Sequence, residues 1–467
     1  MDFDLATGGA GWRPDIPKGA RPVYLAIAQA IADDLASGRL APGDRLPPQR
    51  ELAGALGFDF TTVTRAYAEA RRRGLVQAHV GRGTFVVRPP GAPRRALSAG
   101  MVDMSMNLPP QFDEPALAAR MWASLRTLEA EEGLPLLLRY QEAGGTLRDR
   151  AAGAAWLQER IPGLTAERTL VAAGAQAALA AILGCVVRRG GTLCAEALTY
   201  PGLRSAAAHL DIAVVGLAMD AQGVTPDAFE AACKAAAPQA FYCTPTVQNP
   251  TTATMSLERR QALIAIARRY GVPIIEDDAY GRLPAQSPPP LAALAPELVH
   301  HVAGLAKHVS PALRIAYVVP PDPGALSRTV LGLRAVAGMA SPLTAAAATR
   351  WIEHGLAEAV LLAVRREAIA RRRLAAALLP QARPSGAEAY HLWLDLPRPW
   401  TRGAFQARLR SLDVSVVPSD AFAVAGPAPE GVRISLGAAV TREDLTAALT
   451  TIRDVLGEGP DWQTGVV

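Results

Sequence analysis

Apolar and polar positions follow two periods in the first ninety residues. Residues 23–38, VYLAIAQAIADDLASG, carry apolar side chains at helical spacing and end on a glycine, as an amphipathic helix does. A turn and a short helix are predicted within 40–58, and a second short helix within 59–74. Residues 75–88 alternate apolar and polar positions around GRG, which predicts a β-hairpin. Two tightly joined short helices followed by a hairpin are typical of a winged helix-turn-helix.

From Met104 to about Ile452 the pattern changes to apolar, β-branched runs that alternate with helical segments rich in Ala, Leu and Arg. The predicted strands lie within 170–174, 191–196, 212–217, 239–245, 272–278, 299–307 and 314–320. Strands that are apolar on both faces and separated by helices predict a mainly parallel α/β sheet. Longer helices begin between Arg314 and Pro342. The short strands that follow, within 389–396, 414–418 and 431–437, predict a smaller α+β C-terminal lobe.

The segment between these two patterns, PPGAPRRALSAGMVD at 89–103, has no periodicity and reads as a linker. With 467 residues the chain exceeds what one hydrophobic core usually serves. We therefore expect a DNA-binding domain at 1–88, a linker at 89–103 and an α/β domain at 104–467.

Composition narrows the class of protein. Residues 1–95 carry 14 Lys and Arg against nine Asp and Glu, so the surplus of this segment equals the +5 of the whole chain. A local positive surplus favours a polyanion partner, although a merely solvated patch is the alternative. No run of eighteen uncharged apolar residues and no signal-type start occur, which favours a cytoplasmic protein without a membrane partner. The four cysteines show no CxxC or CxxxH spacing, so no metal site is expected.

The second helix of a helix-turn-helix enters the major groove, and its first turns need short polar side chains and arginines. Thr61, Thr62 and Arg65 occupy these turns in the helix predicted at 59–74. Arg50 in the preceding helix and Arg82 at the hairpin tip are placed to clamp the backbone of double-stranded DNA. For each position taken alone, an ordinary solvated side chain is the alternative.

Lysine is nearly absent from the chain. It contains 45 arginines but only three lysines: Lys18, Lys234 and Lys307. An aldehyde cofactor requires a lysine amine, because the guanidinium of arginine is delocalised and stays protonated. Lys307 follows an apolar strand, where sites form in α/β sheets, whereas Lys234 lies in the helical AACKAAA and is expected in solvent. Lys307 is therefore the plausible Schiff-base residue.

A second set of residues suits a phosphorylated pyridine ring. Asp277, in IIEDDAY, can keep a ring nitrogen protonated, so that the ring acts as an electron sink. Tyr280 and Asn249, in QNPTT, can hold the phenolic oxygen. A phosphate needs a glycine turn at a helix N-terminus beside a cation, which GAQAALAAIL at 174–183 and Arg314 supply. A core tyrosine and a turn-forming asparagine are the alternatives for Tyr280 and Asn249.

The chain resembles two known families in two separate parts. The order LPPQRELA, TTVTRAY, GLV and GRGTFV over residues 20–88 resembles the GntR family of winged-helix repressors. The order GAQ, TYPG, QNPT, EDDAY, Lys307 with Arg314 seven residues later, and GVRISLG resembles the fold-type-I aminotransferases over 104–455. Together they look like the MocR/GabR subfamily of bacterial regulators.

The resemblance implies pyridoxal 5'-phosphate as cofactor and assigns a role to each matching residue. At the ring, Lys307 is implied to form the imine, Asp277 to pair with the pyridine nitrogen, Tyr200 to stack on the ring, and Asn249 and Tyr280 to bind the phenolic oxygen. At the phosphate, Gln176 and Arg314 are implied to bind beside Ala175, and Tyr140 to reach the phosphate of the neighbouring subunit. At the substrate, Arg433 is implied to bind a carboxylate, and Asn107 to lie in the loop that closes over it. In the head, Arg50, Thr61, Thr62, Arg65 and Arg82 are the implied operator contacts.

The chain departs from the aminotransferase pattern around the phosphate. The family usually places hydroxyls one and three residues before the lysine and in the glycine turn, where this chain has Ala306, Gly304 and Ala175. Ser310 is the residue that can compensate. Each hydrogen bond to a charged phosphate is worth about 1.5–3 kcal/mol. Thr252 also replaces the glycine that usually follows QNPT.

The resemblance implies a homodimeric regulator, head-to-tail, in which PLP or a small amino compound is sensed at Lys307 and operator affinity changes through closure of the C-terminal lobe. An active aminotransferase that carries a DNA-binding head is the rival hypothesis. A scaffold that has lost PLP is a third, suggested by the missing hydroxyls.

Overall fold

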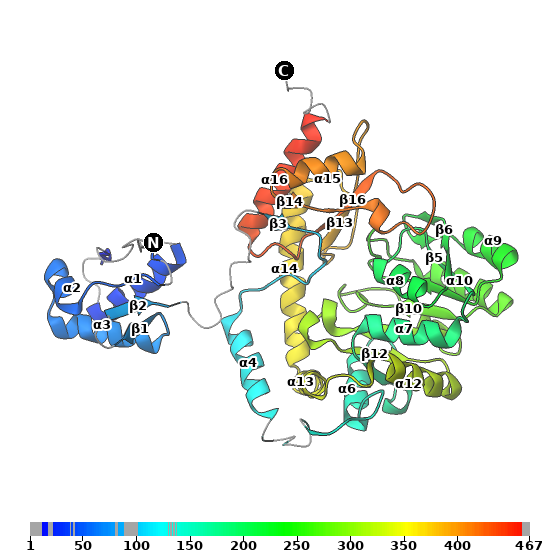
Figure 1. Ribbon diagram of the computed structural model, residues 1–467, viewed down its shortest axis with the longest axis horizontal. Helices are drawn as coiled ribbons and strands as arrows, with labels where there is room; N and C mark the ends of the chain where they lie inside the picture. Colours follow the sequence, from blue (N-terminus) through cyan, green and yellow to red (C-terminus); the bar gives the residue numbers. More distant parts are fainter. Residues whose placement is uncertain are drawn as a thin grey trace, which may run out of the picture. The chain divides into compact units, whose positions relative to one another are not determined.

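The computed structural model describes residues 12–16, 22–37, 39–40, 43–79, 83–87 and 101–459, the last range with gaps at 129, 131–132, 134–135 and 137. The chain divides into two compact units, Met1–Leu97 and Ser98–Val467 (Figure 1). Each unit has a hydrophobic core of its own. They are described separately below.

The first unit is a three-helix head with a hairpin. Its elements are α1 (Val23–Ser37), α2 (Gln49–Leu56), α3 (Phe60–Arg72), β1 (Val76–His79) and the antiparallel β2 (Gly83–Val86). Apolar side chains at helical spacing, among them Ile27 and Ile31 of α1 and Val63 of α3, form its core. The Tyr67 hydroxyl donates to the Pro47 carbonyl over 2.8 Å and thereby ties α3 to the turn before α2. The predicted helix pair with a wing is confirmed.

A seven-stranded sheet forms the centre of the second unit. The strand order is β4 (Leu170–Ala172), β12 (Ala316–Val319), β11 (Val299–Gly304), β10 (Ile274–Asp277), β9 (Ala240–Cys243), β5 (Thr192–Glu196) and β6 (Ala213–Leu217). Strands β11, β10, β9, β5 and β6 pair in parallel, and β12 is antiparallel to both of its neighbours. The predicted mainly parallel sheet is confirmed.

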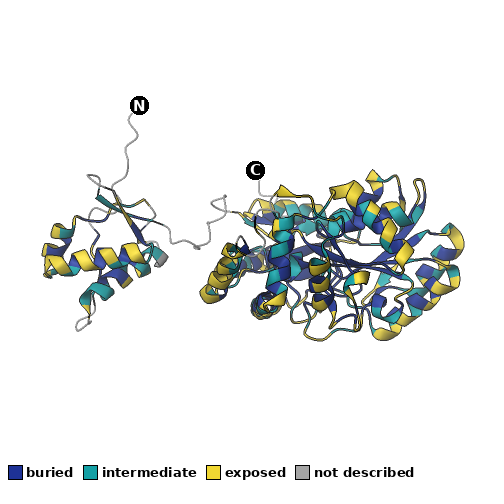
Figure 2. Cartoon of the chain, turned by 90° about the horizontal axis from the view of Figure 1, so that it is seen from below, coloured by how far each residue is buried: buried dark blue, intermediate teal, exposed yellow. Residues whose placement is uncertain are grey.

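Both faces of this sheet are buried, which explains its continuous apolar strands. Side chains alternate along each strand, so Ile274 and Phe241 join one apolar cluster and Ile275 and Tyr242 join the other. Figure 2 shows the buried strands between helices whose outer faces are exposed. The covering helices are α6 (Leu147–Leu157), α7 (Ala175–Val186), α8 (Pro201–His209), α9 (Pro226–Ala236), α10 (Leu257–Tyr270), α12 (Pro323–Ala337) and α13 (Pro342–Glu353).

Shorter elements complete this part of the unit. They are α4 (Pro115–Arg126), α11 (Leu291–Leu294), the hairpin β7 (Met219–Asp220) and β8 (Gly223–Val224), and the 3₁₀ turns η1 (Ala166–Arg168), η2 (Leu305–Lys307) and η3 (Pro311–Leu313). Of these, η2 and η3 follow the central strand β11. They therefore lie at the carboxyl end of the parallel strands, where sites form in such sheets.

The C-terminal lobe has a small antiparallel sheet, β13–β16–β15, covered by helices. Its elements are α14 (Leu356–Leu378), β13 (His391–Asp395), α15 (Arg402–Arg410), β14 (Val414–Ser415), β15 (Val417–Pro418), η4 (Ser419–Ala421), β16 (Gly431–Ser435) and α16 (Arg442–Glu458). The predicted α+β lobe is confirmed.

One end of the expected linker belongs to this lobe. Strand β3 (Val102–Asp103) pairs in parallel with β14, so these two residues, which we placed in the linker, are part of the second unit. The apolar Val102 suits such pairing, but a two-residue strand has no periodicity that a sequence can show. Residues 88–100 lie outside the described part of the chain.

A substitution of Gly153 in α6 tests how closely this helix packs on the sheet. A Cβ at this position would overlap the ring of Tyr317, so Gly153→Ala should lower the free energy of unfolding by about 1–3 kcal/mol. The matched control is Gly184→Ala in α7, where a Cβ meets open space and removal of helical glycine should stabilise by about 0.5–1 kcal/mol. Midpoints of thermal unfolding measure both. Shifts of the same sign and size would contradict this packing.

Candidate functional site

Lys307 is the last residue of η2, directly after β11. Its side chain enters the interior. Burial, followed by the charge of the Arg433 guanidinium, lowers its pKa to about 8, while Asp277 opposes the shift. The Nζ atom donates a hydrogen bond to the Asn107 carbonyl. A buried amine with such a pKa is a better nucleophile near neutral pH than an exposed lysine.

Asp277 ends the neighbouring strand β10 and faces the same region. Its Oδ2 accepts a hydrogen bond from the Tyr242 hydroxyl over 2.8 Å. Its Oδ1 is buried and makes no well-formed hydrogen bond with the described residues, although the Ala279 amide lies close enough to favour the charged carboxylate. Burial raises the pKa of Asp277 to about 6, while the Tyr242 hydroxyl opposes the rise. A buried, ionisable acceptor with a free lone pair is therefore available to a ligand donor.

Asn107 joins several site residues. Its Nδ2 donates to the Tyr280 hydroxyl over 2.7 Å and lies 3.1 Å from His391 Nδ1. His391 Nε2 lies 3.1 Å from the Gln248 carbonyl, which fixes the tautomer with the proton on Nε2. Burial, followed by the charge of Arg433, lowers the pKa of His391 to about 3, so the ring is neutral and Nδ1 accepts. Since Asn107 fills an acceptor position of Tyr280, the phenol proton is free to donate.

His391 contacts the predicted site residues, and the sequence analysis missed it. The one available signal was a histidine among the apolar residues of AYHLWLDL. Its partners come from the distant residues Asn107 and Gln248, which no local pattern reveals.

Arg433, on β16, brings the C-terminal lobe into the site. Its Nη1 donates to Asn249 Oδ1 over 2.9 Å and its Nη2 to the Ser105 carbonyl. Its Nε is buried without a partner among the described residues. Because Asn249 offers its oxygen to Arg433, its Nδ2 group is left to donate to an anionic oxygen.

A third part of the site lies at the N-terminus of α7. Gly174 caps this helix with φ +88°, and a Cβ there would lie 2.9 Å from Arg314 Nη2. Glycine is thus required both by the backbone conformation and by the nearby guanidinium. Helix N-termini and arginine both bind phosphate, so the two features form a cradle for a phosphate group.

The remaining predicted cofactor residues surround this cradle. Ala175 is the first residue of α7, and Gln176 Nε2 donates to the Gly202 carbonyl over 2.8 Å, with its Oε1 buried and unpaired among the described residues. Tyr200 caps α8; burial raises its pKa, and the charges of Asp277 and Arg314 act on it in opposite directions. Ser310 Oγ accepts from the Ala312 amide over 3.2 Å and so caps η3. Its hydroxyl proton stays available, and its contact with a phosphate remains a prediction.

Tyr140 stands apart from this group, because its side chain is 95 % exposed. It contributes nothing to the site of its own chain. The contact with a neighbouring subunit that the sequence implies for it remains a prediction.

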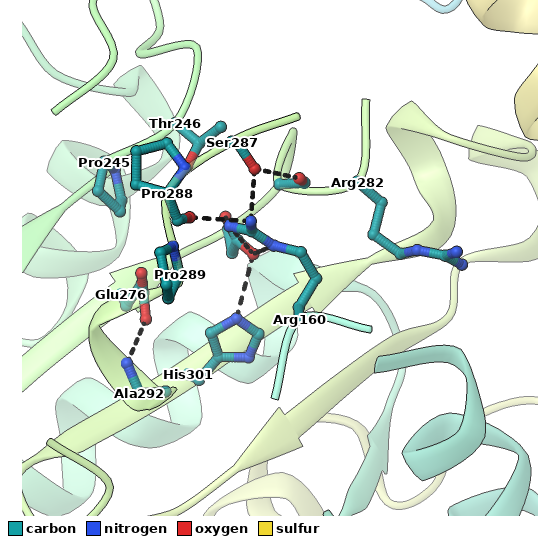
Figure 3. Close-up of polar contacts among 12 residues, drawn as sticks. Arg160, Pro245, Thr246, Glu276, Arg282, Ser287, Pro288, Pro289, Ala292 and His301 are labelled. Atoms are coloured by element: carbon teal, nitrogen blue, oxygen red, sulfur yellow. Dashed lines mark hydrogen bonds and ion pairs between the residues drawn. The ribbon is translucent and has the colours of Figure 1, made fainter. Parts of the chain in front are cut away.

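A second, buried charge network includes Arg160, Glu276 and His301 (Figure 3). Because side chains alternate along β10, Glu276 and Asp278 project to the side opposite Asp277. Asp278 Oδ2 lies 3.3 Å both from Arg160 Nη2 and from His301 Nε2. Burial alone would raise the pKa of Asp278, but Arg160 and His301 hold it well below its usual range. Glu276 accepts hydrogen bonds from the first backbone amides of α11.

Arg260 ties the loop that carries Asn249. Its guanidinium is fully buried and donates to the carbonyls of Met255, Pro245 and Pro289 over 2.9–3.1 Å. One guanidinium therefore holds both ends of the segment 245–255. Asn249 keeps its position through this arginine, which itself does not touch the site.

In the head, the predicted groove-reading residues lie at the start of α3. Asp59 caps this helix by accepting from the Thr61 amide over 2.7 Å. Thr61 and Arg65 are exposed, and Thr62 is partly exposed. Arg65 lies over the Tyr24 ring at 4.3 Å, which holds its guanidinium near the helix.

Beside α3 runs a groove of about 320 Å³ whose lining includes Arg50, Phe60 and Thr84. Arg50 lies 5.7 Å from the Phe60 ring centroid. Arg45 also lines the groove and packs against Gly83 of the wing, a placement that the sequence analysis missed. Arg82 lies outside the described residues, so its predicted contact cannot be placed on the wing.

Comparison with known families gives two matches. Residues 23–86 match the family described as bacterial regulatory proteins of the gntR family. Residues 100–452 match aminotransferase class I and II. The chain belongs to the aminotransferase class I and II family and carries a gntR-family head. This fusion confirms the expected MocR/GabR subfamily.

Relatives with the same organisation are named as regulators. The chain is 31 % identical over 458 residues to the uncharacterized HTH-type transcriptional regulator YdeF of Bacillus subtilis. The match covers 96 % of this chain and 97 % of YdeF. It is 28 % identical to the pyridoxine biosynthesis regulator PdxR of Corynebacterium glutamicum, over 67 % of this chain and 68 % of PdxR. TauR of Rhodobacter capsulatus is also 28 % identical, over 69 % of this chain and 70 % of TauR.

Solved structures confirm the fold of the second unit. LysN, an α-aminoadipate aminotransferase from Thermus thermophilus, matches with a TM-score of 0.70 and 24 % identity, over 77 % of this chain and 92 % of LysN. Aspartate aminotransferase from the same organism in complex with maleate matches with a TM-score of 0.66 and 21 % identity, over 85 % of this chain and 96 % of the enzyme. These likenesses establish the fold-type-I aminotransferase architecture.

The aminotransferase fold implies pyridoxal 5'-phosphate as the cofactor, and the residues fit it. The unsatisfied Asp277 Oδ1 suits a pyridinium N–H, the Gly174 turn with Arg314 suits a phosphate, and Lys307 suits an aldehyde. Within the described residues no three His, Cys, Asp or Glu side chains cluster as metal ligands would. None of the described helices combines the length and apolarity needed to cross a bilayer.

The pKa of Lys307 predicts how capture of the aldehyde depends on pH. The free amine fraction rises as pH increases and levels off above about 8, so the rate at which PLP-free protein captures PLP should level off there. Stopped-flow absorbance between pH 6 and 10 measures this rate. Lys307→Ala should abolish capture and the exposed-lysine control Lys234→Ala should not. A rate that still climbs tenfold per pH unit up to pH 10 would show an unperturbed lysine instead.

Proposed function

We propose that the protein is a PLP-dependent transcriptional regulator that binds double-stranded operator DNA through its head and senses a small amino compound at Lys307. The observation that carries the proposal is the presence, in one chain, of a helix α3 with an exposed, polar first turn and a buried site where the charges of Asp277 and Arg433 act on Lys307. The head and the aminotransferase-like domain of the regulators PdxR and TauR support it.

Each site residue has a defined task in this function. Bound PLP supplies an aldehyde that exchanges amines and a ring that withdraws electrons when protonated. Asp277 holds the proton on the ring nitrogen, and Arg314 with the α7 N-terminus neutralises the phosphate. Tyr280 and Asn249 offer their free donors to the phenolic oxygen, while Tyr200 packs against the ring.

Arg433 determines the class of effector. Its fork matches a carboxylate in a bidentate pair, and the PLP aldehyde that Lys307 would hold reacts with a second, free amine. The effector is therefore expected to carry both an amino group and a carboxylate. A ligand with only one of these groups would engage only part of the site.

The central experiment is binding to the DNA upstream of the protein's own coding sequence, measured by fluorescence anisotropy with and without PLP and a panel of amino acids. The wild type should respond to PLP or to an amino compound, and Lys307→Ala should lose that response while Lys234→Ala keeps it. An unchanged response in Lys307→Ala would refute sensing at Lys307. Repeated turnover of an amino donor and a keto acid, without any change in DNA affinity, would favour the aminotransferase alternative.

Arg65 provides a test of the head. Arg65→Ala should weaken operator binding and reduce the slope of log K against log salt by about 1, because one phosphate contact is lost. Arg71→Ala removes the same charge from an exposed position in the last turn of α3 and is the matched control. Binding should be measured between 50 and 200 mM salt by anisotropy. Equal losses for both variants would mean that α3 does not enter the groove by its N-terminal turns.

The proposed assembly is a head-to-tail homodimer. Large apolar side chains that a monomer would leave in water support a subunit contact: Trp122 is 63 % exposed, Leu138 76 % and Tyr140 95 %. Leu138→Glu should shift the monomer–dimer equilibrium toward monomer, because a charge would be buried at the contact. Analytical ultracentrifugation measures the shift, with Leu412→Glu on the C-terminal lobe as control. Dimerisation that is equally strong in both variants would place the contact elsewhere.

A further inference from the structure

The chain that leaves the head enters the second unit at the effector site. The segment Val102–Leu108, here called the strap, is the first stretch described after the gap at 88–100. It begins as β3 on the C-terminal lobe and then contacts Arg433 and Lys307 within five residues. The residues described directly after the gap at 88–100 therefore include direct contacts of the site.

The first half of the strap is fixed to the C-terminal lobe. The Val102 amide donates to the Asp413 carbonyl over 2.7 Å, and the Met104 amide to the Ser415 carbonyl over 2.9 Å. The Met104 carbonyl accepts from the Ser435 amide over 3.1 Å, and its side chain is fully buried. Met104 is thus bound to β16, two residues from Arg433, and a movement of β16 is passed to the strap.

The second half of the strap is held by the site itself. Arg433 Nη2 donates to the Ser105 carbonyl, and Lys307 Nζ to the Asn107 carbonyl. The Asn107 side chain contacts Tyr280 in the turn after β10 of the large sheet and His391 in the C-terminal lobe. The strap therefore joins the two parts of the second unit through the groups that would bind an effector.

A carboxylate competes with the strap for Arg433. Nη1 donates to Asn249 and Nη2 to Ser105, while Nε is buried without a partner among the described residues. A carboxylate that pairs side-on with Nε and Nη2 therefore competes with Ser105 for Nη2. The Ser105 carbonyl is neutral, whereas a carboxylate brings a full opposite charge and two acceptor oxygens, so it is the stronger partner of the guanidinium. Ser105 is partly exposed, so water can satisfy its carbonyl after displacement.

We propose that the strap is an internal ligand of Arg433, and that an effector carboxylate displaces Ser105 and thereby changes how the connection to the head is held. This regulation rests on the proposed function, in which Arg433 binds the effector carboxylate. It assigns the coupling between the site and the DNA-binding head to a segment of defined contacts.

Hydrogen exchange tests the displacement without DNA. The PLP-loaded full chain is incubated with maleate, a dicarboxylate without an amine, and exchange is followed in peptides covering 101–110 and 431–437. We expect maleate to protect 431–437 and to cause a loss of protection in 101–110, with both responses absent in Arg433→Lys, which keeps the charge but loses the fork. Protection of 431–437 with unchanged exchange in 101–110 overturns the proposal. No response in either peptide overturns it together with the assigned effector class.

Operator binding tests the coupling. Asp103 Oδ1 accepts from the Ser105 amide over 2.8 Å and so aims the Ser105 carbonyl; Asp103 is exposed and lies outside the site. An effector found in the anisotropy panel should change operator affinity by about fivefold or more, and Asp103→Ala should bring this ratio close to one. Asp113→Ala removes the same charge from another exposed position beyond the strap and should keep the ratio.

A full ratio in Asp103→Ala overturns the coupling through the strap. Absence of operator binding in the wild type is a failure of the proposed function, and the exchange experiment still decides whether a carboxylate displaces the strap. The two failures are therefore distinguishable.

Discussion

The site depends on two oppositely charged groups that are buried at the ends of neighbouring strands. Burial disfavours the charge of both Asp277 and Lys307, and each favours the charge of the other. The outcome is an acid with a pKa of about 6 beside an amine with a pKa of about 8. Both pKa values therefore lie close to neutral pH, and the parallel pairing of β10 and β11 holds the two strand ends next to each other.

Much of the fold could be predicted because burial leaves a periodic record in the sequence. The strands of the large sheet are apolar on both faces, and the head alternates helical and strand periods within ninety residues. A lysine buried at a strand end could be predicted because Lys307 alone of the three lysines follows an apolar strand. Asp277 at the end of a second apolar strand, with Tyr280 three residues later, then indicated the acidic part of the site.

The rest could not be predicted because it is made of contacts between distant residues and backbone atoms. Arg433 was expected to bind a ligand, and the structure shows it bound to Asn249 and to the Ser105 carbonyl. Carbonyl groups carry no signal in a sequence. His391 and Arg45 act through neighbours that only the folded chain brings near, and β3 was too short to be told from a linker.

The fully buried Arg260 has a consequence for how such a sensor can diversify. Its guanidinium closes the loop 245–255 through the carbonyls of Pro245 and Met255 and through the Thr246 hydroxyl, so loop side chains other than Thr246 can vary without loss of this closure. The planar fork makes this closure specific to arginine. Recognition of different amines can thus evolve while the backbone of the loop 245–255 is held by a residue outside the site.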